Sequence, residues 1–123
     1  MLYIVDMNKK YERYIDYIVN DLEIPYFKNM RDHYGLKQEE YGLVLSRVYN
    51  QPVTIKGNYV YDQYGNNIYW EDSYGTWVKY EYNEQGYEIY SENSDGFWEK
   101  REYDTKGNQI YYENGDGVID DNR

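Results

Sequence analysis

The sequence contains no cysteine, one histidine and two prolines among its 123 residues. The lack of cysteine excludes disulfide bonds and thiolate metal sites, and it implies no redox compartment. The single histidine, His33, is expected on a helix surface, and no serine lies in a nucleophile-elbow motif. Glycine-rich phosphate-binding motifs are also missing. We therefore expect a protein that is not an enzyme and that has no catalytic residues, no cofactor and no metal site.

Long apolar runs are missing as well. No segment approaches the roughly 18 consecutive apolar residues that a membrane helix requires. The first residues, MLYIVD, are apolar but carry neither a basic leader nor a cleavage site, so they do not read as a secretory signal. We expect a soluble cytoplasmic protein with no membrane partner.

The chain also has no excess of basic residues, because its net charge is −10. Residues 1–57 carry eight Lys or Arg and eight Asp or Glu, so this half is neutral. Residues 58–123 carry five basic residues against fifteen acidic ones, which accounts for the whole net charge. Direct binding of nucleic acid is therefore not expected, and a basic protein surface is the expected partner.

Three short amphipathic helices are predicted in residues 1–57. Apolar residues recur at helical spacing, Asn8 suits the N-cap of the first helix, and Pro25 suits the first turn of the second. A helix-turn-helix DNA reader would need a basic face, so we expect the helices to pack together and to cover part of a sheet. The predicted helices span 8–22, 25–34 and 37–50.

Residues 58–117 contain a threefold repeat of 21 residues. Gly65, Gly86 and Gly107 mark one turn of each copy, and a second turn signal follows about ten residues later. Between turns lie five to seven residues rich in Tyr, Ile and Trp, which is the spacing of a β-meander. The sequence thus predicts an α+β fold with a six-stranded antiparallel meander, followed by an acidic tail at 118–123. The predicted strands lie near 58–62, 67–72, 76–82, 88–93, 97–103 and 109–114.

An odd repeat length would move equivalent side chains to opposite faces unless one turn changes the parity of the pairing. The turn at Asp62 fits a three-residue loop with a left-handed glycine, which pairs Asp62 with Asn66. The second turn fits a two-residue type I′ loop that pairs Ser73 with Thr76. With one turn of each kind, every repeat presents the same residues on the same side.

This pairing predicts two different faces. One face carries the Ile and Trp residues, with Lys79, Glu81, Lys100 and Glu102 among them, and the helices are expected to cover part of it. The other carries tyrosines and carboxylates and is expected to remain exposed, because tyrosine suits half-exposed surfaces and binding sites. The partner-binding residues predicted on the exposed face are Tyr69, Glu71, Tyr80, Tyr82, Glu88, Tyr90, Glu92, Tyr103, Tyr111 and Glu113.

The repeat resembles two known repeat types. The phrase Tyr-Asp-x-x-Gly-Asn, at 61–66 and 103–108 with a looser copy at 82–87, resembles the YD repeats of RHS-type proteins. The segments YENGDG and YSENSDG are similar to the MORN-like repeats of some toxin-neutralising proteins. Both resemblances cover about half of the chain and imply β-hairpins. RHS proteins use many repeats to build a shell around a cargo, and three repeats cannot close one.

The whole chain is similar in style to small phage-encoded proteins, several of which block bacterial defence nucleases, some of them by imitating the charge of DNA. The leading hypothesis is therefore a non-enzymatic acidic interaction protein. The resemblance implies an inhibitor of the anti-CRISPR or anti-restriction type, located in the cytoplasm of a bacterial host. Such an inhibitor would occupy the basic surface of a nucleic-acid-binding protein.

Two alternatives remain open. The chain could be a structural β-repeat protein that forms a homo-oligomer through its sheet edges. It could also be a carbohydrate-binding or hydrolytic sheet that depends on Trp70, Trp77 or Trp98, with an acid/base pair drawn from its many carboxylates. Glu71, Glu92 and Glu113 recur with the repeat, whereas a catalytic pair is singular, so these three are expected to be strand residues.

Overall fold

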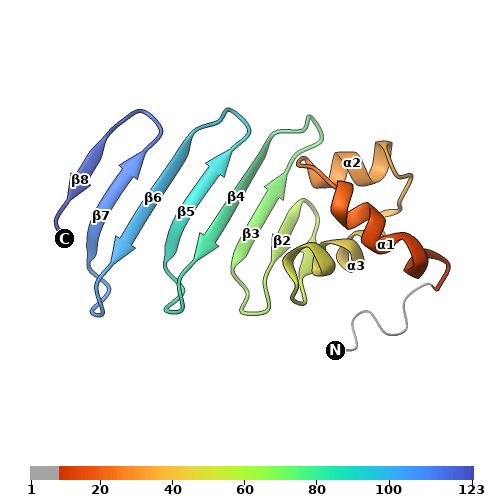
Figure 1. Ribbon diagram of the computed structural model, residues 1–123, viewed down its shortest axis with the longest axis horizontal. Helices are drawn as coiled ribbons and strands as arrows, with labels where there is room; N and C mark the ends of the chain where they lie inside the picture. Colours follow the sequence, from red (N-terminus) through yellow and green to blue (C-terminus); the bar gives the residue numbers. More distant parts are fainter. Residues whose placement is uncertain (1–8) are drawn as a thin grey trace.

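Three helices precede an antiparallel sheet in the computed structural model, which describes residues 9–123 and the side chains from Ile15 onward (Figure 1). The helices are α1 (Lys9–Asp21), α2 (Tyr26–Asp32) and α3 (Gln38–Tyr49), as the apolar spacing predicts. Pro25 lies one position earlier than expected, because it is the N-cap of α2 rather than part of its first turn. The expected cap Asn8 lies outside the described residues.

The sheet is a meander in which each strand pairs with the next, in the order β1 to β8. It therefore has eight strands, and the prediction of six is wrong. A three-residue strand is added at each end, one before residue 58 and one within the segment expected to be a tail. Three residues are too few to show a period of two, so these strands leave no clear signal in the sequence. The strands are β1 (Thr54–Lys56), β2 (Tyr59–Tyr61), β3 (Asn67–Glu71), β4 (Trp77–Tyr82), β5 (Glu88–Asn93), β6 (Trp98–Tyr103), β7 (Gln109–Asn114) and β8 (Ile119–Asp121).

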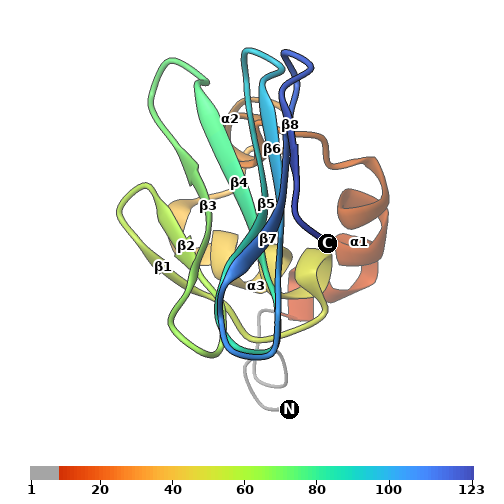
Figure 2. The same cartoon turned by 90° about the vertical axis from the view of Figure 1, so that its left-hand side faces the viewer.

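All three helices lie on one side of the sheet, over the end formed by the first strands (Figures 1 and 2). The apolar side chains of the helices meet the sheet there in a single core, against which Trp77 and Tyr82 of β4 also pack, and the strands from β5 onward extend beyond it. The fully or almost fully buried members of this core are Ile18, Phe27, Met30, Leu36, Tyr41, Val44, Leu45, Val60, Ile68 and Tyr69.

The six turns from β2 to β8 share one design. In the first, Asp62 N–H donates to the Asn66 carbonyl, and Asp62 Oδ1 accepts from the N–H groups of Tyr64 and Asn66, each at 2.9 Å. Gly65 adopts a φ of +87°, which side chains rarely allow. The three-residue loop predicted at this turn is confirmed. An Asp or Asn begins each turn and makes the same side-chain bonds, at 62, 72, 83, 93, 104 and 114.

The second turn of each repeat is therefore not the two-residue loop that was predicted. Asp72 N–H donates to the Thr76 carbonyl, and Glu71 is the residue that pairs with Trp77. Parity is instead restored by a β-bulge in each repeat. Glu81 pairs with Tyr90 and the next pair is Tyr82 with Glu88. Ile89, which lies between Glu88 and Tyr90, therefore has no partner on β4 and is the extra residue. The extra residues of the three repeats are Ile68, Ile89 and Ile110.

This register corrects the expected separation of the two faces. Because Glu71 lies opposite Trp77 and Glu92 lies opposite Trp98, these carboxylates and these two Trp residues share a face, whereas Trp70 lies on the other face. We call the face toward the helices the helix-side face and the other the open face. The helix-side face carries Val60, Tyr69, Glu71, Trp77, Lys79, Glu81, Tyr90, Glu92, Trp98, Lys100, Glu102, Tyr111, Glu113, Ile119 and Asp121. The open face carries Tyr59, Trp70, Val78, Tyr80, Tyr82, Glu88, Ser91, Glu99, Arg101, Tyr103 and Tyr112.

Glu71 joins the helical unit to the sheet. Its side chain is only 2% exposed, and its two carboxylate oxygens accept the backbone N–H groups of Phe27 and Lys28, each at 2.8 Å. Tyr69 Oη donates to the same carboxylate at 2.7 Å and accepts from Tyr26 N–H at 3.1 Å. These N–H groups belong to the first turn of α2 and have no acceptor within the helix. A carboxylate of the sheet therefore caps a helix of the neighbouring layer.

Substituting Glu71 should destabilise the whole fold. In the Glu71→Gln variant an amide group faces two buried N–H donors, so we expect the free energy of unfolding to fall by about 2–4 kcal/mol. Urea denaturation followed by circular dichroism measures this change. Glu92→Gln and Glu113→Gln, at the equivalent positions of the other repeats, are the controls and should each cost less than about 1 kcal/mol. Equal losses in all three variants would contradict the capping role.

Candidate functional site

The described residues contain no metal-binding cluster of His, Cys, Asp and Glu. Among residues 9–123, no helix is both long and apolar enough to cross a membrane. His33 is exposed just after α2, where its ring lies edge-on to Tyr34 with centroids 4.8 Å apart. The arrangement that recurs in the structure is a different one, built from tyrosine and glutamate.

A hydrogen-bonded tyrosine and glutamate occur on the helix-side face of every repeat. In each pair the phenol donates to the carboxylate of the residue two positions later on the same strand, at 2.7–2.9 Å. Residues i and i+2 of a strand lie on one face, so the spacing itself brings the two groups together. We call these pairs the Tyr–Glu dyads. They are Tyr69–Glu71 on β3, Tyr90–Glu92 on β5 and Tyr111–Glu113 on β7.

The first dyad is occupied by the chain itself, since it holds the first turn of α2. Burial raises the pKa of Tyr69, and its hydrogen bond to Glu71 raises it further. The phenol therefore stays protonated and can donate at any physiological pH. The ring of Tyr69 also packs against the rings of Tyr26 and Phe27, with centroids 4.8 and 5.9 Å away.

The second dyad is not covered by the helices. Tyr90 Oη donates to Glu92 Oε1, and Lys79 Nζ lies 3.6 Å from that same oxygen. The side chain of Glu92 is 32% exposed. Burial is the main cause that raises the pKa of Tyr90, and the bond to Glu92 adds to it. This dyad is therefore formed in the same way as the first, but it remains accessible.

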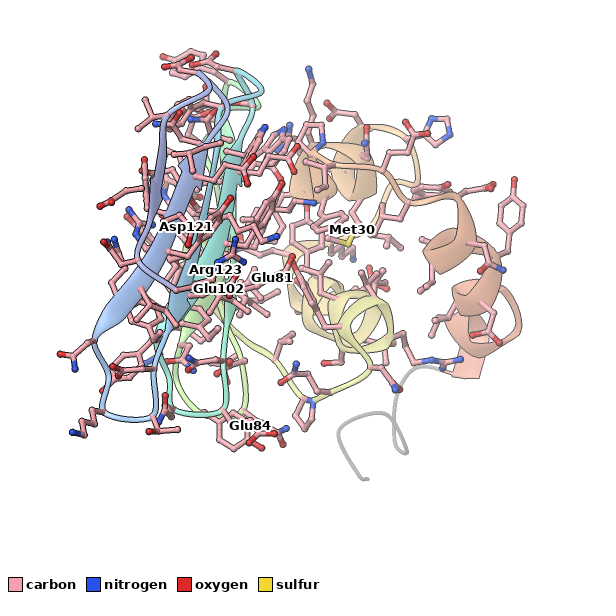
Figure 3. All side chains as sticks on the ribbon, turned by 60° about the vertical axis from the view of Figure 1, so that its left-hand side comes forward. Met30, Glu81, Glu84, Glu102, Asp121 and Arg123 are labelled. Carbon is pink, nitrogen blue, oxygen red and sulfur yellow. The ribbon has the colours of Figure 1, made fainter. Side chains whose placement is uncertain are left out.

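A shallow groove of about 470 Å³ runs beside the second dyad, between β4, β5 and β6. Tyr90 and the bulge residue Ile89 line it, with carboxylates at its rim. Glu81 is exposed and Glu102 is half-buried, and both belong to the helix-side face (Figure 3). The groove therefore places the ring of Tyr90 beside two carboxylates. Two basic side chains, Lys100 and Arg101, also line it, and the remaining lining residues are Asn83 and Tyr103.

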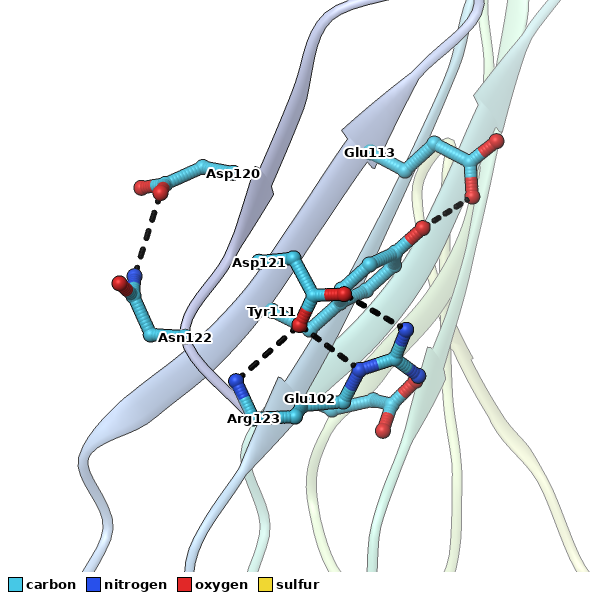
Figure 4. Close-up of polar contacts among 7 residues, drawn as sticks. All are labelled: Glu102, Tyr111, Glu113, Asp120, Asp121, Asn122 and Arg123. Carbon is cyan, nitrogen blue, oxygen red and sulfur yellow. Dashed lines mark hydrogen bonds and ion pairs between the residues drawn. The ribbon is translucent and has the colours of Figure 1, made fainter.

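The third dyad is covered by the last residue of the chain. The guanidinium of Arg123 lies over the ring of Tyr111, 4.0 Å from its centroid (Figure 4). It also pairs with Asp121 at 3.0 Å and with Glu102 at 3.2 Å. Tyr111 is 8% exposed under this cover. The helix-side face thus binds a guanidinium by stacking it on a dyad tyrosine between carboxylates.

The ten residues predicted to bind a partner do not form one surface. Six of them make up the three dyads on the helix-side face. Tyr69 and Glu71 are buried beneath the helices, so they cannot belong to an exposed surface as expected. The other four lie on the open face, and they are Tyr80, Tyr82, Glu88 and Tyr103.

Three of the four open-face residues, Tyr82, Glu88 and Tyr103, make contacts within the sheet. Tyr82 Oη donates to the Asn67 carbonyl at 2.7 Å, and the ring of Tyr103 lies 5.0 Å from that of Tyr87. Glu88 accepts from Arg101 at 3.1 Å. Burial raises the pKa of the Glu88 carboxyl, although the charge of Arg101 opposes the shift. These residues therefore stabilise the sheet through contacts of their own.

Glu81, Glu102 and Arg123 are not among the ten predicted residues. The predicted pairing puts the two glutamates on the face expected beneath the helices, and it puts Arg123 in an acidic tail. A signal was present, because Glu81 and Glu102 are one repeat apart, whereas the equivalent residue in the first repeat is the buried Val60. That change from valine to glutamate marks where the helical cover ends.

No protein-family model matches the chain, and no curated protein is significantly similar to it. The resemblance to YD and MORN-like repeats therefore stays a prediction, while the succession of antiparallel hairpins is observed directly.

Tyrosine nitration should distinguish the equivalent phenols of the first two repeats. Tyr69 is buried with a raised pKa, so we expect it to stay unmodified by tetranitromethane at pH 8. Tyr64 and Tyr74 are 80% and 89% exposed and should react first, and Tyr90 should follow. Mass spectrometry of peptides from the folded protein gives the order, with denatured protein as the control. Protection of Tyr90 equal to that of Tyr69 would contradict an accessible second dyad.

Proposed function

We propose that this protein is a non-enzymatic interaction protein whose helix-side face, beyond the helices, docks on a basic protein surface. The observation that carries the proposal is the packing of Arg123 on Tyr111 between Glu102 and Asp121. It is an example, within the chain, of how this face binds an arginine. The groove beside Tyr90 offers the same ring, with Glu81 in the position that Glu102 has beside Tyr111.

The charge distribution supports a basic partner. The second half of the chain carries the entire net charge of −10, and it forms the sheet. A sheet with this net charge raises the rate at which a basic partner is encountered. Desolvated contacts between aromatic rings and arginines then slow dissociation. The surface that we assign to the partner consists of Lys79, Glu81, Tyr90, Glu92, Lys100 and Glu102.

The specific role that we propose is inhibition of a bacterial nucleic-acid-binding defence protein, of the anti-CRISPR or anti-restriction type. Carboxylates spaced across the strands of an extended sheet suit a groove that otherwise binds phosphates. The protein would then act by occupying that groove, without chemical change to the partner.

The sheet edges favour this function over self-association. Both edge strands are only three residues long, and β8 carries Asp120 and Asp121. Short and charged edge strands are a common device against pairing between copies. A single carbohydrate platform is also not favoured, because Trp70 lies on the open face while Trp77 and Trp98 lie on the helix-side face.

Binding of an arginine-rich peptide tests the docking surface. We expect the Glu81→Gln/Glu102→Gln variant to bind fluorescein-labelled nona-arginine about five- to tenfold more weakly than the parent protein, measured by anisotropy at 0.15 M salt. Asp95→Asn/Asp116→Asn is the matched control, because it removes the same charge at exposed turn tips. It should change the affinity less than about twofold. Equal weakening in both variants would mean that only net charge matters.

Competition with DNA tests the inhibitory role. We expect the immobilised protein to retain a bacterial nucleic-acid-binding protein from a nuclease-treated lysate, and duplex DNA to release it because both ligands need the same basic groove. The Glu81→Lys/Glu102→Lys variant should retain at least about tenfold less. Retention that duplex DNA does not affect, or that survives 1 M salt, would contradict competition for a basic groove.

A further inference from the structure

We propose that the second dyad, Tyr90–Glu92, with the groove beside it, seats the first turn of an α-helix from the partner, and that an arginine of that turn stacks on Tyr90. This inference rests on the proposed function and names the structural element that the partner contributes. In this arrangement the carboxylate of Glu92 accepts hydrogen bonds from two backbone N–H groups of the partner helix, and the arginine of that helix stacks on the ring of Tyr90.

The first repeat shows the same dyad holding a helix. Tyr69–Glu71 and Tyr90–Glu92 are one repeat apart, on the same face, with phenol-to-carboxylate distances of 2.7 and 2.9 Å. The Glu71 carboxylate accepts two consecutive first-turn N–H groups, one on each oxygen. Among the described residues no donor lies on Glu92 Oε2, although Lys79 approaches Oε1. The second dyad therefore has the geometry of the first without its helix.

The groove coincides with the position that the helical core takes in the first repeat. Ile68 and Tyr69 are buried against the helices, and one repeat later Ile89 and Tyr90 line the groove. The main difference is that the buried Val60 of the first repeat is replaced by Glu81. An occupant of the groove therefore meets Ile89 and Tyr90 together with the carboxylates of Glu81 and Glu102, which suit a helix that carries a basic side chain in its first turn.

Electrostatics favours a helix N-terminus over an extended strand. The free N–H groups of a first helical turn carry a partial positive charge of about half an elementary unit, so a carboxylate is a favourable partner for them. The side chain on the dyad ring differs between the two occupied repeats. It is the aromatic ring of Tyr26 on Tyr69 and the guanidinium of Arg123 on Tyr111. Beside Glu81 and Glu102, the guanidinium is the better match for Tyr90.

Two lysines of this face, Lys79 and Lys100, are cations that the partner must accommodate. Lys100 lies opposite Tyr90 and is exposed, and Lys79 contacts the dyad carboxylate itself. The Nζ atom of Lys79 is 3.6 Å from Glu92 Oε1, and its side chain is 36% exposed. A pair of this length and exposure contributes little to stability, so the lysine can move aside or share the carboxylate. The arriving N–H groups would replace a weak ion pair with shorter, charge-assisted hydrogen bonds.

The chain's own helix provides the probe for a test. A lactam-bridged helical peptide of residues 23–34, with Tyr26→Arg, carries the first turn that fits the first dyad and the arginine that we assign to the second. Its titration into the ¹⁵N-labelled full chain should shift amide signals of β4, β5 and β6. We expect Glu92→Gln to weaken binding at least fivefold. The open-face control Glu99→Gln should change it less than twofold, with circular dichroism confirming that both variants remain folded.

A second peptide separates backbone capping from charge. Amide-to-ester replacement at the Phe27 and Lys28 positions removes the two N–H donors and keeps every side chain, so we expect it to weaken binding at least fivefold. If this peptide binds as well as the parent while Glu81→Gln still weakens binding, the helix-capping inference is wrong and the proposed function stands. If neither change matters, both are wrong. Absence of shifts at millimolar peptide, or shifts at the β3 dyad instead, would also overturn the inference.

Discussion

The buried carboxylate of Glu71 is the interaction on which the arrangement of helices and sheet depends. A charged side chain that is 2% exposed would be costly without full hydrogen bonding, and this one accepts two backbone N–H groups and a phenol. Those N–H groups would in turn be left without an acceptor at the start of α2. The carboxylate of the sheet and the N–H groups of the helix therefore serve as hydrogen-bond partners for each other. These bonds fix which side of the sheet the helices cover.

The three Tyr–Glu dyads have the same internal geometry but lie in three different environments. Under the helices, the dyad is a buried structural joint. At the C-terminal end of the sheet, Arg123 covers the dyad tyrosine. Between them lies the second dyad, the only one of the three with neither cover among the described residues, beside the groove that Glu81 and Glu102 help to line. Two of the three equivalent dyads are thus covered by other parts of the chain, and one is exposed. The proposed docking function is based on this difference between the dyads.

The sequence predicted the architecture well because turns and strands depend on local chemistry. The Asp or Asn that begins each turn and the glycine three residues later are visible directly, and so are the helices of the first half. The register of the strands was not predicted. The bulges at Ile68, Ile89 and Ile110 change the side of every following residue, and a bulge has no distinct signature in a strand rich in Ile and Tyr. The loop predicted at Asp72 is also wrong, although Asp72 and Gly75 have the same spacing as Asp62 and Gly65 and form the same turn.

The candidate site was predicted less well than the fold. The dyad residues Tyr90, Glu92, Tyr111 and Glu113 were selected, and the structure places them on one face. Glu71 was selected with them, because a sequence repeat gives identical residues identical roles. Its burial comes from α2, which is more than forty residues earlier in the chain. The same helix explains why Val60 and Glu81 differ although they are equivalent, since only one of them lies under the cover.

Amide hydrogen exchange of the intact protein, measured by NMR at Phe27 and Lys28, tests the central claim most directly. First-turn amides of a helix usually exchange quickly, because they lack an acceptor within the helix. If Glu71 caps α2, these two amides should exchange only on global unfolding, as slowly as the paired amides of β3. Exchange at the rate of exposed amides would show that the carboxylate of the repeat does not hold a helix, and the account of all three dyads would fail.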